Sequence, residues 1–289
     1  MNVLPCLLLA LLCYAVPLQG TAWAERHAQD NAFPQRIISL APSVTELLFA
    51  LDCGSRVAGR STNSTTPHEA RDIPDVGPYN RPSAEKILAL HPDLCIALRD
   101  GTPATVIRQL RRAGSPVLVL DIESFESLGK AVITLGKALG QNEKASLAAA
   151  QLKQRLHAAR QRLGKYEDRP TVLFQLQAAP LIAAGLCSFA GRLIENAGGI
   201  NAVRHSPSSY PVLGMEDALL LDPDVIIIAG MGNAEEDAAS ARRWKRWKHI
   251  AAVRSGRVHI VDSDIFTRPS LRAVDALETL ISLLHPDKN

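Results

Sequence analysis

A motif that occurs twice constrains the fold of this chain most strongly. One copy begins at Glu85 and reads E-K-I-L-A-L-H-P-D-L-C-I-A; the other begins at Glu216 and reads E-D-A-L-L-L-D-P-D-V-I-I-I-A. The leucine spacing predicts a short helix, and the Pro-Asp pair ends it because proline cannot continue a helix. The apolar run that follows is typical of a strand buried on both faces of a parallel sheet.

A second pair of similar segments follows the motif. Residues 113–121 read A-G-S-P-V-L-V-L-D, and residues 255–262 read S-G-R-V-H-I-V-D. In both segments a glycine is followed by β-branched and aliphatic residues and then by an aspartate. This order predicts the next strand of each half. Each half therefore has the order helix–strand–helix–strand, which predicts an α/β fold of two Rossmann-like lobes.

The remaining pattern places further elements in each half. Ser43 and Glu46 have the spacing of a capping box for a helix over 44–51. In the first half we predict strands at 36–40, 93–98 and 116–120, with helices at 82–90, 103–113 and 124–139. In the second half we predict strands at 171–176, 180–184, 224–229 and 257–261, with helices at 189–197, 214–221, 237–252 and 270–284.

A long helix is predicted between the halves. Residues 142–163 contain no Gly or Pro, and Leu152, Leu156, Ala159 and Leu163 form an apolar stripe at helical spacing. Such a helix spans roughly 30 Å. It either joins two lobes or packs within one domain, and we favour the joining role.

These predictions give a domain organisation that begins with an export signal. Residues 7–16 are apolar, and Ala22-Trp23-Ala24 has the A-x-A form of a signal-peptide cleavage site before Glu25. We expect a signal peptide at 1–24, an N-terminal lobe at 35–141, a linking helix at 142–166 and a C-terminal lobe at 167–289. The protein is then exported to the periplasm, where we expect a monomer without a lipid anchor.

Cysteine, histidine and charge patterns exclude several classes of function. Cys53, Cys95 and Cys187 would remain after cleavage, and an odd number cannot form a closed disulfide framework. No histidines share metal-ligand spacing, so we expect no metal site and no cofactor, and a metal-dependent hydrolase or chelatase is the less favoured alternative class. The formal net charge is +3. In the basic run 242–249, Trp244 and Trp247 share a helical face, which favours a surface helix over a nucleic-acid site.

Four segments together resemble one known family. They are I-I-S-L-A-P-S-V-T-E-L-L-F-A-L at 37–51, D-V-G-P-Y-N-R-P-S-A-E-K-I-L-A-L-H-P-D-L at 75–94, A-G-G-I-N-A-V at 197–203, and S-D-I-F-T-R-P-S-L-R at 263–272. They resemble the periplasmic solute-binding proteins that serve ABC importers of cobalamin, haem and iron-siderophores. The resemblance runs from Arg36 to about His285.

The resemblance implies a ligand cleft between two lobes and a membrane partner. It implies that two carboxylates, one on each lobe, dock onto arginines of an ABC permease dimer. Glu85 and Glu216 are the equivalent acids that the repeated motif identifies. Near a helix start a carboxylate is also favoured by the helix dipole, so a purely structural role is the alternative. A two-fold partner and the strength of Arg–carboxylate pairs favour docking.

Within this family the C-terminal segment looks most similar to cobalamin-binding members. That similarity implies that Asp264 and Arg268 bind the amide groups of a corrinoid, and that Tyr79 and Tyr210 form aromatic walls. Leu98 and Leu181 stand where the best-known cobalamin binder has aromatics, and Asn63 replaces a tyrosine. The alternatives are ordinary loop tyrosines and a surface ion pair.

Haem and ferric siderophore are the other ligands the family suggests. Tyr79 and Arg81 are similar to a tyrosine–arginine pair of haem-binding members, and His205 would be a second axial ligand. Arg81, Arg99 and Arg268 would suit an anionic chelate. The sequence therefore predicts a receptor rather than an enzyme, with a corrinoid as the favoured ligand.

Overall fold

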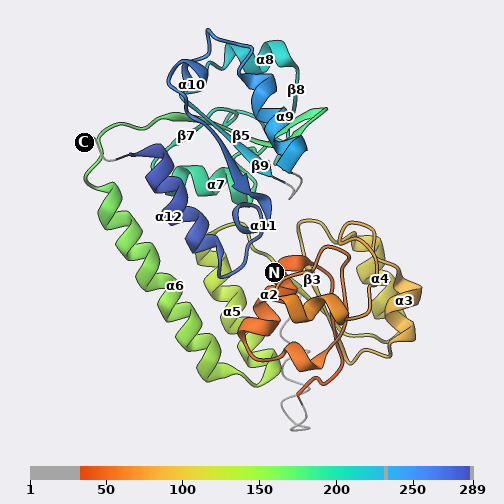
Figure 1. Ribbon diagram of the computed structural model, residues 1–289. Coiled ribbons are helices and arrows are strands. Elements are labelled where there is room, and N and C mark those ends of the chain that lie inside the picture. The colour runs from red at the N-terminus through yellow and green to blue at the C-terminus, as the bar shows by residue number, and fades with distance from the viewer. Residues whose placement is uncertain (1–32, 231–233, 287–289) are drawn as a thin grey trace, which may run out of the picture. The chain divides into compact units, whose positions relative to one another are not determined.

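Two separate β-sheets organise the chain. The computed structural model describes residues 33–230 and 234–286, so the predicted signal peptide lies outside the described residues. One sheet contains strands from residues 37–120 and the other contains strands from residues 171–262 (Figure 1). We refer to these sheets with their helices as the N-terminal lobe (β1–β4) and the C-terminal lobe (β5–β10). The predicted two-lobed α/β fold is confirmed.

The N-terminal sheet is entirely parallel, in the order β2-β1-β3-β4. Its strands are β1 (Ile37–Ser39), β2 (Val57–Arg60), β3 (Leu94–Leu98) and β4 (Val117–Leu120). All five residues of β3 are buried, as expected for an inner strand with helices on both faces. Strand β2 was not predicted, because its short V-A-G-R sequence has no apolar run.

The C-terminal sheet has a parallel centre with an antiparallel extension. Its order is β10-β9-β5-β6-β8, and β7 pairs with the start of β5. The strands are β5 (Thr171–Ala178), β6 (Leu181–Ala183), β7 (Ile200–Asn201), β8 (Val212–Leu213), β9 (Val225–Gly230) and β10 (Val258–Asp262). Strand β9 lies between β5 and β10, just as β3 lies between β1 and β4. The repeated motif therefore supplies the inner strand of each lobe.

Helices connect and cover these strands. In the first half they are α2 (Pro42–Ala50), η1 (Gly54–Arg56), η2 (His68–Asp72), α3 (Ala84–Ala89), α4 (Ala104–Arg112), α5 (Phe125–Leu139) and α6 (Asn142–Leu163). In the second half they are α7 (Phe189–Asn196), α8 (Met215–Leu220), α9 (Ala234–Trp244), α10 (Ala251–Arg254), α11 (Ser263–Phe266) and α12 (Ala273–Leu284).

The Pro-Asp pairs of the motif have the same structural role in both lobes. Asp93 accepts hydrogen bonds from the backbone N–H groups of Gln35 and Arg36, just before β1. Asp224 accepts one from Thr171 at the start of β5, at 2.8 Å. Each aspartate thus ties the beginning of its inner strand to the first strand of the lobe, and both copies of the motif make this contact.

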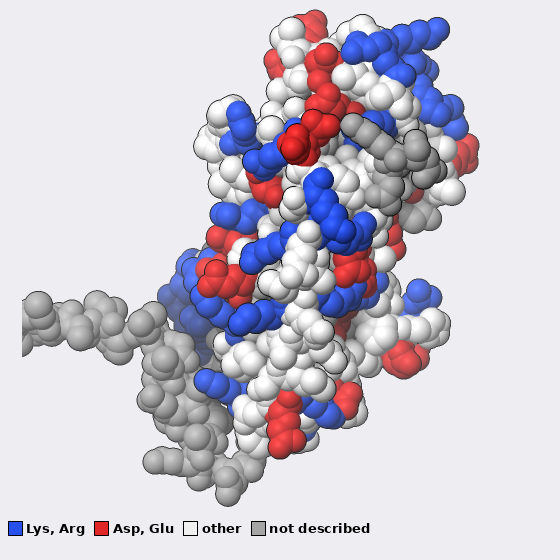
Figure 2. Space-filling model, turned by 90° about the vertical axis from the view of Figure 1, so that its left-hand side faces the viewer, with Lys and Arg blue, Asp and Glu red and all other residues white. Residues whose placement is uncertain are grey.

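Helix α6 contains 22 residues and lies beside helices from both halves of the chain. It packs against α5 and α12 (Figure 1). Arg155 of α6 pairs with Asp275 and Glu278 of α12, each at 2.7 Å. Figure 2 shows acidic and basic side chains intermingled over the face on which α6 lies. The predicted stripe is partly buried, with Leu152 at 4% and Ala159 at 2% exposure.

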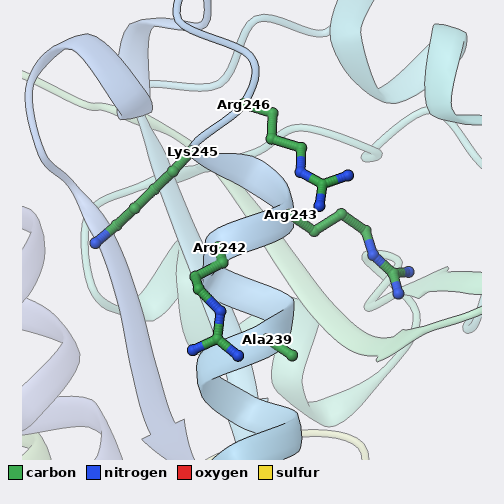
Figure 3. Close-up of a pocket in the computed structure, with 5 residues that line it drawn as sticks. All are labelled: Ala239, Arg242, Arg243, Lys245 and Arg246. Carbon is green, nitrogen blue, oxygen red and sulfur yellow. The ribbon is translucent and has the colours of Figure 1, made fainter.

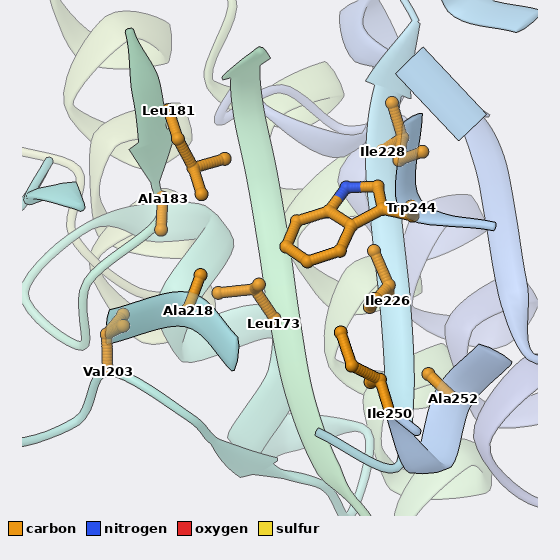
Figure 4. Close-up of a cluster of buried hydrophobic side chains, with 10 residues drawn as sticks. All are labelled: Leu173, Leu181, Ala183, Val203, Ala218, Ile226, Ile228, Trp244, Ile250 and Ala252. Atoms are coloured by element: carbon orange, nitrogen blue, oxygen red, sulfur yellow. The ribbon is translucent and has the colours of Figure 1, made fainter. Parts of the chain in front are cut away.

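The helix predicted over 237–252 is wrong in its extent. Helix α9 ends at Trp244, and α10 begins only at Ala251. Trp244 is buried in the core of the C-terminal lobe (Figure 4), where its Nε1 donates to Gln175 Oε1 at 2.7 Å. The chain turns after Trp244, and Ile250 is fully buried in the same core. The predicted apolar face is therefore present, although a turn interrupts the helix.

Candidate functional site

A cluster of two tyrosines and one aspartate joins the two lobes. Tyr79 lies in the loop before α3 and Tyr210 in the loop before β8, and they are 42% and 44% exposed. Tyr210 Oη donates a hydrogen bond to Asp100 Oδ2 at 2.9 Å. Asp100 follows β3, so this bond connects the C-terminal lobe to the N-terminal lobe. The sequence analysis identified both tyrosines but missed Asp100.

Gly101 fixes the position of Tyr79. A Cβ atom at Gly101 would overlap the Tyr79 ring at Cε2 and Cδ2, and the residue has φ +118°. Only glycine adopts that backbone conformation readily. The Tyr79 ring therefore lies directly against the loop that carries Asp100.

Both phenols of the cluster hold their protons strongly. Burial raises the pKa of Tyr79, and the negative charge of Asp100 raises it further. For Tyr210, burial again raises the pKa most, followed by the charge and hydrogen bond of Asp100. The cluster thus presents neutral aromatic rings beside one carboxylate.

A second contact between the lobes centres on a buried carboxylate. Glu46 of α2 has a side chain only 7% exposed, and it accepts hydrogen bonds from Arg272 Nε and Nη2 at 2.9 and 2.8 Å. Arg268 Nη1 donates to the same carboxylate at 3.2 Å. Two arginines from the C-terminal half therefore enclose one acid of the N-terminal lobe, an arrangement that buried charges require.

The predicted capping box at Ser43 and Glu46 is wrong. Helix α2 begins at Pro42, its N-cap is Ala41, and no side chain caps it. Glu46 is instead used in the contact with Arg268 and Arg272. The sequence signal that could have found it is a lone acid in an otherwise apolar helix, P-S-V-T-E-L-L-F-A.

Asp264 and Arg268, which the resemblance implies as ligand-binding residues, form an ion pair. Arg268 Nη2 lies 2.5 Å from Asp264 Oδ1 and also donates to the Asn63 carbonyl oxygen at 3.1 Å. Burial raises the pKa of Asp264, and the nearby charge of Arg268 opposes this shift. The side chain of Arg268 is 12% exposed. Through Arg268, which also donates to Glu46, the pair takes part in the contact between the lobes, while the Asp264 side chain remains 37% exposed.

The remaining predicted ligand residues form no hydrogen bond or ion pair with Tyr79, Asp100 or Tyr210 among the described residues. Leu98 is buried at the end of β3, with 8% exposure, and Arg81 is exposed in the Tyr79 loop. Arg99 is paired with Asp121 at 2.6 Å. His205 is exposed, and its Nε2 accepts a hydrogen bond from Arg204 Nε at 3.2 Å.

Glu85 and Glu216 occupy equivalent, exposed positions. Each is the second residue of a six-residue helix, α3 or α8, directly before the inner strand of its lobe. Ser83 caps α3 through its hydroxyl, and Asp217 accepts the Gly214 N–H at the start of α8. Because other side chains make these capping contacts, both glutamates remain available to a partner.

Two pockets of the described structure are lined by none of Tyr79, Asp100 and Tyr210. One has a volume of about 390 Å³ and is lined by α2, residues 66–69 and residues 270–272, next to the Glu46–Arg272 pair. The other, about 610 Å³, lies on α9 and is lined by Ala239, Arg242, Arg243, Lys245 and Arg246. Figure 3 shows that Arg242 and Lys245 point to one side of the helix, and Arg243 and Arg246 to the other.

Other reactive side chains form no additional centre in residues 33–230 and 234–286. There, no three His, Cys, Asp or Glu residues group as metal ligands. The three cysteines among these residues, Cys53, Cys95 and Cys187, are free thiols, and burial raises the pKa of Cys95 to about 12. No helix among the described residues is both long and apolar enough to cross a membrane.

Comparison with known proteins decides the family. The family model described as periplasmic binding protein matches residues 37–265. The chain belongs to the periplasmic binding protein family. This periplasmic binding protein is 30% identical to an uncharacterized ABC transporter substrate-binding lipoprotein, YvrC of Bacillus subtilis, over 88% of this chain and 81% of the relative.

Solved structures with the same fold include proteins named for two different ligands. The vitamin B12-binding protein BtuF of Vibrio cholerae has a TM-score of 0.80 and 27% identity, covering 87% of this chain and 96% of that structure. A periplasmic haem-binding protein of Pseudomonas aeruginosa has a TM-score of 0.79 and 28% identity, covering 89% and 94%. This periplasmic binding protein is therefore similar both to a vitamin B12-binding protein and to a haem-binding protein.

Proposed function

We propose that this protein captures a corrinoid, cobalamin or a related compound, in the periplasm and delivers it to an ABC importer. The observation that carries this proposal is the pairing of neutral aromatic rings with polar groups where the lobes meet. Tyr79 and Tyr210 offer flat apolar area, which suits a macrocycle. Asp264 and Arg268 offer a hydrogen-bond acceptor and a donor, which suits peripheral amides. The similarity to a vitamin B12-binding protein supports the same ligand class.

Delivery uses the two exposed acids in this proposal. Glu85 and Glu216 lie at matched positions on α3 and α8, one in each lobe. A permease dimer with paired arginines would bind both acids at once, because Arg–carboxylate pairs are strong and directional.

Export in this proposal includes cleavage of the signal peptide after Ala24. N-terminal sequencing of the secreted protein would then begin at Glu25.

Haem is the second candidate, favoured by the similarity to the haem-binding protein of Pseudomonas aeruginosa and by Tyr79 beside Arg81. The tyrosines weigh against it. Burial and the charge of Asp100 raise the pKa of Tyr79 and of Tyr210. A phenol that retains its proton is a poorer ligand for ferric iron, since metal ligands bind in their deprotonated form. The corrinoid therefore fits better than haem.

Titration calorimetry of the mature chain with cyanocobalamin, dicyanocobinamide and hemin tests this function. We expect sub-micromolar binding of a corrinoid, with the corrinoid recovered unchanged because the protein is a receptor and not an enzyme. A response to hemin alone would overturn the corrinoid assignment. A changed absorption spectrum of the recovered corrinoid would instead indicate an enzyme.

A further inference from the structure

Asp100 differs from the other carboxylates that lie where the lobes meet. Glu46 is enclosed by Arg268 and Arg272, and Asp264 is paired with Arg268. Asp100 is hydrogen-bonded by the neutral hydroxyl of Tyr210. Among the described residues it forms no ion pair with a lysine or arginine. Its negative charge is therefore the one in this group that no cation of the described structure compensates.

The nearest basic residue in sequence is already occupied. Arg99 points its guanidinium at Asp121, with Nε 2.6 Å from Oδ2. The hydrogen bond from Tyr210 uses Oδ2 of Asp100, and Oδ1 accepts no hydrogen bond in the part of the chain that the structure describes. One carboxylate oxygen thus remains as an acceptor beside the Tyr79 and Tyr210 rings.

We infer that Asp100 is a selectivity residue, which accepts hydrogen bonds from macrocycles bearing peripheral amides and repels macrocycles bearing peripheral carboxylates. The inference rests on the proposed function, because it concerns the ligand of the same site. An amide N–H is a donor that a carboxylate oxygen accepts strongly. A second carboxylate close to Asp100 would be disfavoured by like-charge repulsion, which is how a site rejects a ligand of similar shape.

The substitution that tests this inference is Asp100→Asn. Asparagine has nearly the same shape and keeps an acceptor oxygen for Tyr210, but it removes the charge. We expect the affinity for hemin, which carries two carboxylates, to rise about tenfold when one close repulsion is removed. The affinity for hemin dimethyl ester, which lacks those charges, should stay within the error of the measurement.

A matched control separates local from general electrostatics. Glu143→Gln removes one negative charge from the exposed first turn of α6 and should change neither affinity. If the Asp100→Asn variant binds hemin no better than the native chain, or fails to bind it at all, Asp100 is not what excludes carboxylates. An equal gain for hemin and its dimethyl ester would equally overturn the inference, because the effect would then not depend on charge.

The failure of this inference is distinguishable from the failure of the proposed function. Absence of corrinoid binding by the native chain would defeat the proposed function, yet the comparison of hemin with its ester would still report on Asp100. Conversely, corrinoid binding with no charge-dependent change in hemin affinity would defeat only the role of Asp100.

Discussion

At the scale of single residues, the contact between the lobes depends on side chains with closely constrained surroundings. Gly101 has φ +118°, and its missing side chain makes room for the Tyr79 ring. Glu46 is buried between two arginines. Each can be tested with a variant that changes one physical property at a time.

Gly101→Ala should weaken corrinoid binding, because the added methyl group displaces Tyr79. Gly114→Ala is the matched control, since Gly114 also has a left-handed φ of +84° but nothing lies within 4 Å of an added Cβ. Both variants should lose about 1 kcal/mol of unfolding free energy from backbone strain. Only Gly101→Ala should reduce the affinity measured by calorimetry. Equal affinities for the two variants would show that Tyr79 does not contact the ligand.

Glu46→Gln should lower the free energy of unfolding by about 2–3 kcal/mol, because Arg272 then loses its paired charge and Arg268 keeps only Asp264. Urea unfolding followed by circular dichroism measures this change. Glu143→Gln, which alters an exposed acid of α6, should leave the curve nearly unchanged. A Glu46→Gln variant as stable as the native chain would mean that the two arginines are satisfied by other groups or by water.

At the scale of helices and strands, the sequence predicted the features that depend on residues close together in the chain. The stripe of α6 and the repeated motif before β3 and β9 depend on spacing within about ten residues, and both are present. The break after α9 was missed because a distant partner, Gln175, holds Trp244 in the core. Glu46 was misassigned for the same reason: its partner Arg268 lies 222 residues away. Asp100 was missed because only folding brings Tyr210 to it.

His285 links the end of α12 to the segment after α6, and it predicts how stability changes with pH. The ring is 7% exposed, stacks on Tyr166 at 4.5 Å and lies 3.0 Å from the Ala197 carbonyl oxygen. Burial lowers the pKa of His285 below its ordinary value of 6.5. Below that value the unfolded chain binds a proton that the folded chain does not, so stability falls as the pH decreases.

Unfolding by urea at pH values from 7.5 to 5.5 measures this dependence. His285→Gln should reduce the loss of unfolding free energy over that range, because glutamine retains an N–H donor for Ala197 but does not titrate. His259, whose pKa burial also lowers, remains in both proteins and cancels in the comparison. An unchanged pH dependence in the variant would exclude His285 as a contributor.

At the scale of the whole molecule, the proposed function has two separate tasks, and each lobe contributes residues to both. In this proposal the Tyr79, Asp100 and Tyr210 cluster would bind the ligand where the lobes meet, whereas Glu85 and Glu216 lie exposed at the starts of α3 and α8. No residue is shared between the two sets. Ligand binding and permease docking should therefore be separable by mutation.

The double variant Glu85→Arg/Glu216→Arg should keep the corrinoid affinity of the native chain. It should bind at least about tenfold more weakly to inner-membrane vesicles from the producing bacterium, because the two arginines that replace the docking carboxylates then repel the permease arginines. Cosedimentation of the ligand-loaded protein with these vesicles measures the affinity.

The control Glu126→Arg/Glu143→Arg reverses two exposed acids on α5 and α6 and produces the same net charge. Equal binding by both double variants would exclude docking through Glu85 and Glu216. A loss of corrinoid affinity in the first variant alone would instead place these acids in the ligand site. Since each single reversal leaves one docking acid intact, Glu85→Arg and Glu216→Arg should each weaken vesicle binding less than the double variant does.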